Sequence, residues 1–219
     1  MKISKESIIR VIILFVGLTV AHLGVSLFLL ADLGTDPFNV LVQGVFRSIQ
    51  SVFQIGWLTH GKVHRIICFI IILVLLLVDK SYVRIGTLIC MFCGGPIIDF
   101  FTAMLSPLVA AGPSIYIRLI MNAVGCVILA MGMTVVIQSE AGTGPNDLVA
   151  VVLSDKTGVR FSLMRVIVDV VFTAVGWLLG GSVGVGTLIC AFLVGPVAGF
   201  FMPKSKKIVQ DIVGRFVKA

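Results

Sequence analysis

Apolar residues in this 219-residue chain fall into long runs that short polar stretches separate. A helix needs about 20 residues to cross the hydrocarbon of a bilayer, and six runs meet or approach that length. They cover residues 8–30, 63–78, 83–105, 115–137, 163–179 and 183–202. The pattern therefore predicts an all-α, polytopic membrane protein with about six transmembrane helices.

Two shorter apolar runs, 37–53 and 145–153, each follow a turn of the form Gly-Thr-x-Pro. The turns are Gly34-Thr35-Asp36-Pro37 and Gly142-Thr143-Gly144-Pro145. Glycine permits the turn, Thr or Asp can cap free N–H groups, and Pro suits the first turn of a helix. At a rise of about 1.5 Å per residue, the second run reaches only about 14 Å, which is too short to cross. We expect both runs to be half-helices or surface helices.

Matches at two fixed offsets indicate an internal repeat. An offset of 108 residues aligns the first long run with the fourth, including Arg10 with Arg118, and aligns the two turns. An offset of 100 aligns the sequence Gly-Thr-Leu-Ile-Cys at 86–90 with the same sequence at 186–190. It also aligns Gly95-Pro96 with Gly195-Pro196. Such matches are typical of duplication, so the chain is interpreted as one membrane domain, 1–219, with repeats at 8–105 and 115–202.

The number of spans decides how the two repeats are oriented. Three spans per repeat would invert the second repeat in the membrane, as in many transporters, whereas four would make the repeats parallel. Lys and Arg favour the cytoplasmic side, where six spans place 13 of the 17 cations and eight spans place 15. The charges thus favour eight spans, whereas the short second half-helix favours six spans. We give more weight to the length of this helix. Both arrangements put both termini on the cytoplasmic side of the cell's inner membrane.

The two ends of the chain carry clustered positive charge. Residues 203–219 contain five Lys or Arg residues, with apolar residues at helical spacing. This pattern predicts a basic amphipathic helix along the anionic inner leaflet, although a simple stop-transfer flank fits equally well. Lys2, Lys5 and Arg10 resemble the start of a signal peptide, but no cleavage motif follows. An uncleaved first span is therefore the better interpretation.

Composition narrows the classes of function. The chain is 58% hydrophobic and 12% charged, with a mean hydropathy of +1.16, whereas about a quarter of the residues in soluble proteins are charged. Its net charge of +7 comes from cations at the ends of apolar runs, so nucleic acid is not an expected partner. The sequence offers neither a nucleophile with a base nor a set of metal ligands, which argues against an enzyme, a cofactor or a metal site. Cys90 and Cys93 form a CxxC within an apolar run and are interpreted as packing residues.

Several of these motifs together resemble a known family. The Gly-Thr-Asp-Pro turn at 34–37, the Ile-Gly-Thr segment at 85–87 and the following Gly95-Pro96 resemble the YczE/YitT group of bacterial inner-membrane proteins. The resemblance covers residues 8–202, and it implies an integral membrane protein without an agreed substrate or mechanism. Gly144 stands where the first turn has Asp36, so a role for Asp36 would not be duplicated.

Two ionisable residues lie within the predicted spans, where such groups are costly and often functional. His22 aligns with Ala130, and Asp99 aligns with Gly199, so neither is duplicated. His22 could belong to a polar pathway or could bond to a backbone carbonyl group. Asp99 could bind an ion or a proton, or could pair with a Lys or Arg at the membrane interface.

Other polar residues favour structural roles. Arg165 and Asp169 are four residues apart, which predicts an ion pair within one helix. Arg65 aligns with Arg165 at the offset of 100 and is interpreted as part of the scaffold or as a phosphate-level anchor. We expect interhelical hydrogen bonds from Gln43, Asn122 and Gln138.

The two turns suggest where a solute would bind. If each half-helix begins inside the protein, its free N–H groups and positive dipole end point into a shared cavity near the midplane. The candidate binding residues are Thr35, Asp36, Thr143, His22 and Asp99. Helix breaks at Gly95-Pro96 and Gly195-Pro196 would add free carbonyl groups. The alternative is that both turns lie at the membrane interface and only end a span.

These observations favour a small-solute transporter or permease-like protein that binds a small polar or anionic solute. One alternative is a substrate-binding membrane subunit that needs a separate ATPase. Another is a membrane assembly or scaffold protein that does not transport. The lipid bilayer is the main expected partner, and a homodimer or a partner membrane subunit is compatible with the sequence.

Overall fold

The computed structural model describes residues 4–218, apart from the side chains of residues 161, 162, 217 and 218. The α-helices are α1 (Lys5–Ala31), α2 (Pro37–Phe53), α3 (His60–Asp79), α4 (Ile85–Val109), α5 (Ile115–Gln138), α6 (Pro145–Thr157), α7 (Phe161–Leu178) and α8 (Val185–Lys218). A short 3₁₀ helix, η1 (Lys80–Tyr82), follows α3. Residues 4–218 contain no strand, so the all-α prediction is confirmed, and each predicted span or half-helix corresponds to a helix.

Five helices in the described part of the chain are long and apolar enough to cross a membrane. They are α1, α3 together with η1, α4, α5 and α8. α7 has 18 residues, a length of about 27 Å that is close to the lower limit for a span. α2 has the predicted bounds, whereas α6 has 13 residues and ends four residues later than predicted. Even so, α6 is only about 20 Å long, too short to cross.

Local sequence sets where the helices begin. The Ser4 hydroxyl accepts a hydrogen bond from Ser7 N at the start of α1, as an N-cap should. Asp36 is the N-cap of α2, and Pro37 occupies its first position. Gly144 precedes α6 and offers no side-chain cap. The two turns therefore begin their helices differently, because the capping carboxylate is present only in the first.

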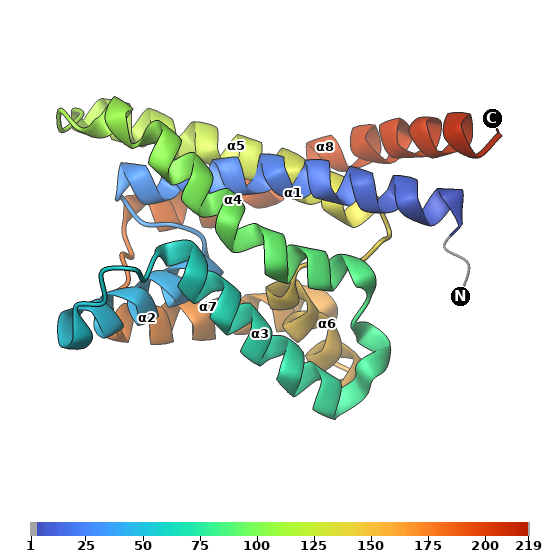
Figure 1. Cartoon of the computed structure of the whole chain (residues 1–219), viewed down its shortest axis with the longest axis horizontal. Helices are drawn as coiled ribbons and strands as arrows, with labels where there is room; N and C mark the ends of the chain where they lie inside the picture. Colours follow the sequence, from blue (N-terminus) through green and yellow to red (C-terminus); the bar gives the residue numbers. More distant parts are fainter. Residues whose placement is uncertain (1–3, 219) are drawn as a thin grey trace.

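α1 and α5 form the centre of the molecule and run antiparallel to each other (Figure 1). Glycine lets the two backbones approach closely: a Cβ atom on Gly24 would lie 2.6 Å from Gly125 O, and one on Gly132 would lie 2.6 Å from Gly17 O. α4 packs against α1, and α8 packs against α5. α1, α4, α5 and α8 thus form one bundle along the long axis of the molecule.

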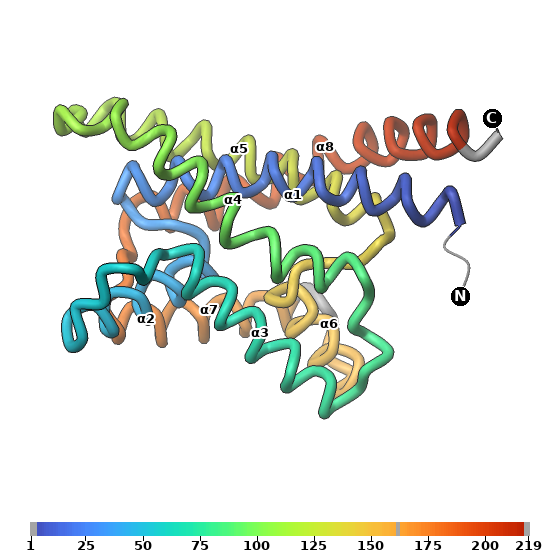
Figure 2. The backbone as a smooth tube through the Cα atoms, viewed as in Figure 1, coloured from blue at the N-terminus to red at the C-terminus, as the bar shows by residue number. Residues whose placement is uncertain are grey.

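The remaining helices form a second layer beside this bundle. α2 packs against α7 and α3, and α6 packs against α7 and α3. After α1 the chain folds back toward the middle of the molecule before α2 begins (Figure 2). α2 and α6 both begin near the middle and run toward opposite ends (Figure 1). The N-terminal end of α1 and the C-terminal end of α8 lie at the same end of the molecule (Figure 1).

The predicted breaks at Gly95-Pro96 and Gly195-Pro196 are wrong. α4 continues through Pro96, and α8 continues through both Pro196 and Pro203. A proline removes one backbone donor, and in an apolar environment the helix keeps its other hydrogen bonds because each lost one is expensive. The basic tail is likewise a continuation of α8 to Lys218 instead of a separate helix, and Ala219 lies outside the described residues.

Candidate functional site

The two Gly-Thr-x-Pro turns dock on corresponding helix starts in the opposite half of the chain. Gly186 N, in the first turn of α8, donates a hydrogen bond to Leu33 O (2.7 Å). Gly86 N, in the first turn of α4, donates to Ala141 O (3.1 Å). The offset of 100 relates the two donors and the offset of 108 relates the two acceptors. Each half of the chain therefore fixes the turn of the other.

Both turns require glycine. Gly34 has φ of +102° and Gly142 has φ of +148°, in a region that side-chain-bearing residues rarely occupy. Space is also lacking, because a Cβ atom on Gly34 would lie 2.4 Å from Thr187 Oγ1 and one on Gly142 would lie 2.7 Å from Thr87 N. These constraints hold the chain on its path back into the molecule.

Two arginines bind the chain where α1 and α5 end. Arg118 Nη2 donates to Asp32 O (2.6 Å) and lies 3.8 Å from the Asp32 carboxylate. At the other end of the molecule, Arg10 Nη1 donates to Ser139 O (3.2 Å) and pairs with Glu140 (2.8 Å). A cation is favourable beside the free carbonyl groups of a helix C-terminus. These two contacts are again related by the offset of 108.

The first turn begins a buried chain of hydrogen bonds. Asp36 Oδ2 accepts from Asn39 Nδ2 (2.8 Å) and from Thr35 Oγ1 (3.2 Å), and Asp36 Oδ1 accepts from Asn39 N (3.3 Å). Asn39 Oδ1 lies 3.1 Å from His60 Nε2, which identifies that nitrogen as the donor. Thr35 and Asn39 are 1% and 4% exposed.

An ion-pair network joins the start of α6 to α7. Arg165 on α7 donates to Asp147 near the start of α6 and to Asp169 (2.9 Å), which confirms the predicted pair within α7. The start of α2 lies against α7 close to this network, since the rings of Phe38 on α2 and Phe172 on α7 are 5.6 Å apart. We call this set the central polar cluster. It comprises Thr35, Asp36, Asn39, His60, Asp147, Arg165 and Asp169.

Asp99 lies outside this cluster and caps the start of α3. Its Oδ2 accepts from Thr59 Oγ1 (2.6 Å), and its Oδ1 accepts from Gly61 N (2.9 Å). α3 and α4 touch at the same level, since a Cβ atom on Gly95 would lie 2.1 Å from Gly61 O. Asp99 therefore lacks the Lys or Arg partner of the second interpretation, and both of its carboxylate oxygens accept hydrogen bonds from the start of α3.

His22 faces the interior but uses its ring mainly for local bonding. Its Nδ1 lies 2.8 Å from Leu18 O, one turn earlier in α1, as the structural alternative predicted. The ring also meets His64 edge-on at 5.6 Å between centroids, and His64 meets Phe38 in the same way at 5.3 Å. Contacts between aromatic rings, and not hydrogen bonds, thus connect His22 to the start of α2.

Sequence reasoning found only part of the cluster. It named Thr35 and Asp36 but missed Asn39, His60 and Asp147 as site residues. Asn39 and Asp147 align at the offset of 108, a signal that could have found them. His60 has no such signal, because its partner is defined by tertiary contact alone. Thr143 is half-buried in the second turn and takes no part in the side-chain hydrogen bonds found within residues 4–218.

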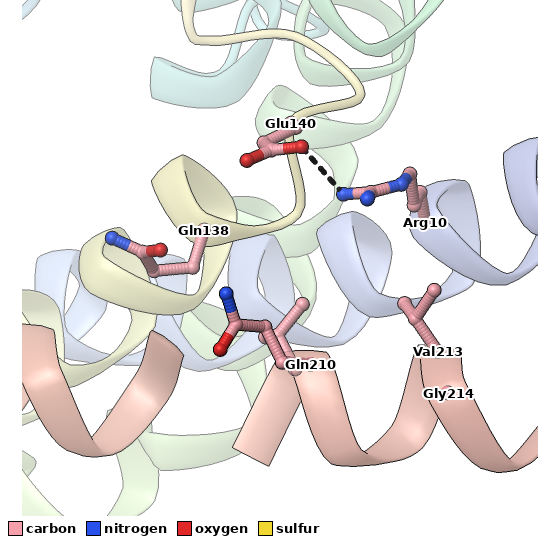
Figure 3. A pocket seen from close by; sticks show the side chains of 7 residues that line it. Arg10, Gln138, Glu140, Gln210, Val213 and Gly214 are labelled. Atoms are coloured by element: carbon pink, nitrogen blue, oxygen red, sulfur yellow. Dashed lines mark ion pairs between the residues drawn. The ribbon is translucent and has the colours of Figure 1, made fainter. Parts of the chain in front are cut away.

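A separate cavity of about 210 Å³ lies at the end of the molecule where α1 begins. Figure 3 shows the Arg10–Glu140 pair on one side of it and Gln138 and Gln210 on another. This cavity belongs to the helix ends and not to the central polar cluster. Across the described residues, no three His, Cys, Asp or Glu side chains are grouped in a way that could hold a metal ion.

Comparison with known proteins gives the family. The model of a family of unknown function, DUF6198, matches residues 8–203. The chain belongs to this family. It is similar to the uncharacterised membrane protein YczE of Bacillus subtilis (strain 168), with 29% identity over 212 residues that cover 96% of this chain and 94% of YczE. The resemblance to YczE inferred from the turn motifs is confirmed.

Further relatives agree with this assignment. An uncharacterised protein of Haemophilus influenzae is 28% identical over 193 residues, 87% of this chain and 82% of that protein. The uncharacterised protein YyaS of Bacillus subtilis is 26% identical over 189 residues, 86% of this chain and 90% of YyaS. No solved structure matches. With its apolar helices, this DUF6198 protein is an integral membrane protein.

Proposed function

We propose that the protein is a small-solute transporter of the cell's inner membrane, with the central polar cluster as its solute site. The observation that carries this proposal is the place where the half-helices begin. α2 and α6 both start near the middle of the molecule, with Asp36 and Asp147 at their first turns. Charged groups at membrane depth beside half-helix N-termini are typical of solute and ion sites.

We further propose that six spans form two inverted repeats. Eight spans would place Arg10 and Glu140 on opposite sides of the membrane, although they are in contact. The same holds for Arg118 and Asp32. Six spans place each pair on one side. The antiparallel packing of α1 and α5 supports the same arrangement, because these helices are the first spans of the two repeats.

The orientation follows from the positive charges. The N-terminal end of α1 and the C-terminal end of α8 lie at the same end of the molecule, and the segments at this end carry the basic residues of both termini. The positive-inside rule therefore assigns it to the cytoplasm. The turn between α2 and α3 and the turn between α4 and α5 then face outward.

The charges of the central polar cluster indicate which charge a bound solute would carry. Arg165 pairs with both Asp147 and Asp169, whereas Asp36 is absent from the ion pairs of the described residues. Helix N-termini alone would favour an anion. An excess of carboxylates in a protein interior favours a positive group instead. We therefore propose a small polar solute with a cationic group, or a proton that accompanies the solute.

Solute binding is tested by the thermal stability of the purified protein with a metabolite panel that includes amines and carboxylates. We expect a cationic solute to raise the melting temperature and Asp36→Asn to abolish the shift, because the substitution removes the cluster's unpaired charge. Asp211→Asn is the control, since Asp211 is exposed on α8. An unchanged shift in Asp36→Asn would remove this site assignment.

Transport by the protein alone in liposomes separates this function from its alternatives. Solute uptake by reconstituted protein supports the transporter. Uptake that requires a co-purified ATPase would support the substrate-binding subunit. Loss of another membrane complex on deletion, without any uptake activity, would support the scaffold.

A further inference from the structure

An arginine that both halves of the chain carry is neutralised in only one of them. Arg65 on α3 and Arg165 on α7 are related by the offset of 100. Arg165 pairs with Asp147 and Asp169, but the same offset puts Phe69 at the position of Asp169. At the offset of 108, the asparagine of the central polar cluster replaces the other carboxylate. The first half therefore lacks both acids that hold the second arginine.

Arg65 has no charged partner of its own. Across residues 4–218 no ion pair includes it, and its Nε atom is buried without a hydrogen bond. α3 is long and apolar enough to cross a membrane, so this cation lies in a segment where charged side chains normally have a partner. An anion beside Arg65 would satisfy a group that the described residues leave unpaired.

A second cation lies on the same face of α3. Lys62 precedes Arg65 by three residues, and it too is absent from the ion pairs of residues 4–218. Its Nζ donates to Trp57 O (2.6 Å) and lies 5.1 Å from the centroid of the Trp57 ring. Asp99, which caps α3, accepts hydrogen bonds from other donors on both oxygens. The start of α3 thus carries two positive charges that no carboxylate of the described residues pairs with.

The surface of α3 beyond these cations is apolar. Its next outward-facing side chains are each about half exposed: Ile66, Phe69, Ile70 and Leu73. Trp57, just before α3, is 66% exposed, and tryptophan is enriched where a membrane meets water. Lys and Arg near the end of a membrane helix extend their charged groups toward that level. Two cations beside a tryptophan, followed by apolar side chains, match the phosphate and the acyl chain of a phospholipid.

We propose that Lys62 and Arg65 bind the phosphate group of an anionic phospholipid, whose acyl chain lies along Phe69 and its exposed neighbours. Arg65 is then the phosphate-level anchor, whereas Arg165, held by two acids, belongs to the scaffold. In the proposed orientation the start of α3 faces outward, so the lipid belongs to the leaflet that faces the outside of the cell. The binding itself depends on neither that orientation nor transport.

Native mass spectrometry of the purified protein with added lipid tests the site. The probes are phosphatidylglycerol, which is anionic, phosphatidylcholine, which is zwitterionic, and inorganic phosphate. We expect phosphatidylglycerol to bind about tenfold more tightly than phosphatidylcholine, because charged hydrogen bonds to its phosphate are not offset by a cation on the same lipid. Inorganic phosphate should bind far more weakly, because it has no acyl chain to contact the apolar surface of α3.

Phe69→Asp supplies the decisive variant, because it gives Arg65 the acid that Arg165 has four residues later. We expect this variant to bind phosphatidylglycerol about tenfold more weakly than the parent, although both cations remain. Phe69→Asn is the matched control, since it has nearly the same shape as the aspartate but no charge, and it should keep most of the binding. The two variants should have similar melting temperatures, because the new carboxylate pairs with Arg65.

Two double variants test the cations directly. Lys62→Gln with Arg65→Gln should lose the preference for phosphatidylglycerol over phosphatidylcholine. Lys80→Gln with Arg84→Gln removes the same charge from the turn between α3 and α4, where both residues are exposed. This second double variant should keep the preference, because it leaves the proposed site intact.

Equal binding of phosphatidylglycerol by Phe69→Asp and Phe69→Asn, or equal loss in the two double variants, overturns the proposal. Inorganic phosphate that binds as tightly as the lipid would also overturn it, because the site would then serve a free anion. The same holds if Phe69→Asp dissociates a dimer and leaves lipid binding unchanged, because a carboxylate of the second copy would then be the partner of Arg65.

Discussion

Single residues in this protein are constrained most strongly where backbones meet. Between α1 and α5, glycine is needed because carbonyl and amide groups of the partner helix occupy the place of a Cβ atom. In the central polar cluster the constraint is electrostatic, because two carboxylates depend on one guanidinium. These two kinds of constraint predict different consequences of substitution.

Gly132→Ala should destabilise the protein by about 2 kcal/mol, the usual cost of overpacking a well-packed site. The new Cβ atom would lie 2.2 Å from Ala21 N, and a backbone atom cannot move aside as a side chain can. Thermal unfolding in detergent measures the effect. Gly214→Ala, in open space, is the control, and equal melting temperatures for the two variants would contradict the α1–α5 contact.

Arg165→Met should destabilise the protein by about 3 kcal/mol, the lower end for a buried pair, because it leaves the charges of two partly buried carboxylates unpaired. Adding Asp147→Asn and Asp169→Asn to this variant should recover most of the loss, since no unpaired charge then remains. Chemical unfolding of the parent, the single variant and the triple variant provides the comparison. A triple variant as unstable as Arg165→Met would show that packing, and not charge, gives Arg165 its role.

The residue scale also shows where sequence reasoning reached its limit. Asp36 was found because it belongs to the first turn motif. The Arg165–Asp169 pair was found because its two residues are four positions apart in one helix. His60 was missed because its bond to Asn39 depends on how α2 and α3 pack. The role of Asp99 was missed for the same reason, since its partners precede it by about forty residues.

At the scale of helices, the lengths of the apolar runs predicted the helices well. The Gly-Pro pairs, by contrast, led to predicted helix breaks that the structure does not have. The bounds of α2 match the prediction, and α6 differs by one turn. A helix break was predicted at Pro96 because proline lacks a backbone N–H donor. The helix nevertheless continues, because losing further backbone hydrogen bonds in an apolar environment would be costly. In this chain Gly95-Pro96 marks a place of close approach between helices.

Pro96→Ala should therefore preserve α4 and raise stability by about 1 kcal/mol, because alanine restores a backbone donor and favours helix. Pro96 itself is exposed, so little packing is lost. Melting temperature and helix content by circular dichroism would measure the change. Pro145→Ala, at the first position of α6 where no donor is used, should have no comparable effect, and a strong loss of stability in Pro96→Ala would contradict a continuous α4.

At the scale of the whole molecule, composition alone indicated a membrane protein, whereas the orientation of the halves required tertiary contacts. Charge counting favoured eight spans and helix length favoured six. The contact between Arg10 and Glu140 joins residues that are 130 positions apart in the sequence. No local pattern reports such a contact, so the sequence left both arrangements open.

Labelling of single cysteines in intact cells tests the six-span arrangement. With a reagent that cannot cross the membrane, Gly56→Cys and Ala111→Cys should be labelled from outside, because both lie in outward-facing turns. Arg160→Cys, in the turn before α7, should be labelled only after lysis. All three positions are exposed. Protection of the first two sites in intact cells would require the eight-span arrangement.

The hydrogen bonds that join each turn to a helix start in the other half have a consequence for synthesis of the chain. Leu33 is made early, but the amide that pairs with its carbonyl belongs to Gly186 and leaves the ribosome more than 150 residues later. Until then the first half carries an incomplete turn, because the carbonyl group of Leu33 lacks the amide that binds it in the folded protein. The first half made alone should therefore be degraded, and separate expression of both halves in one cell should restore the protein.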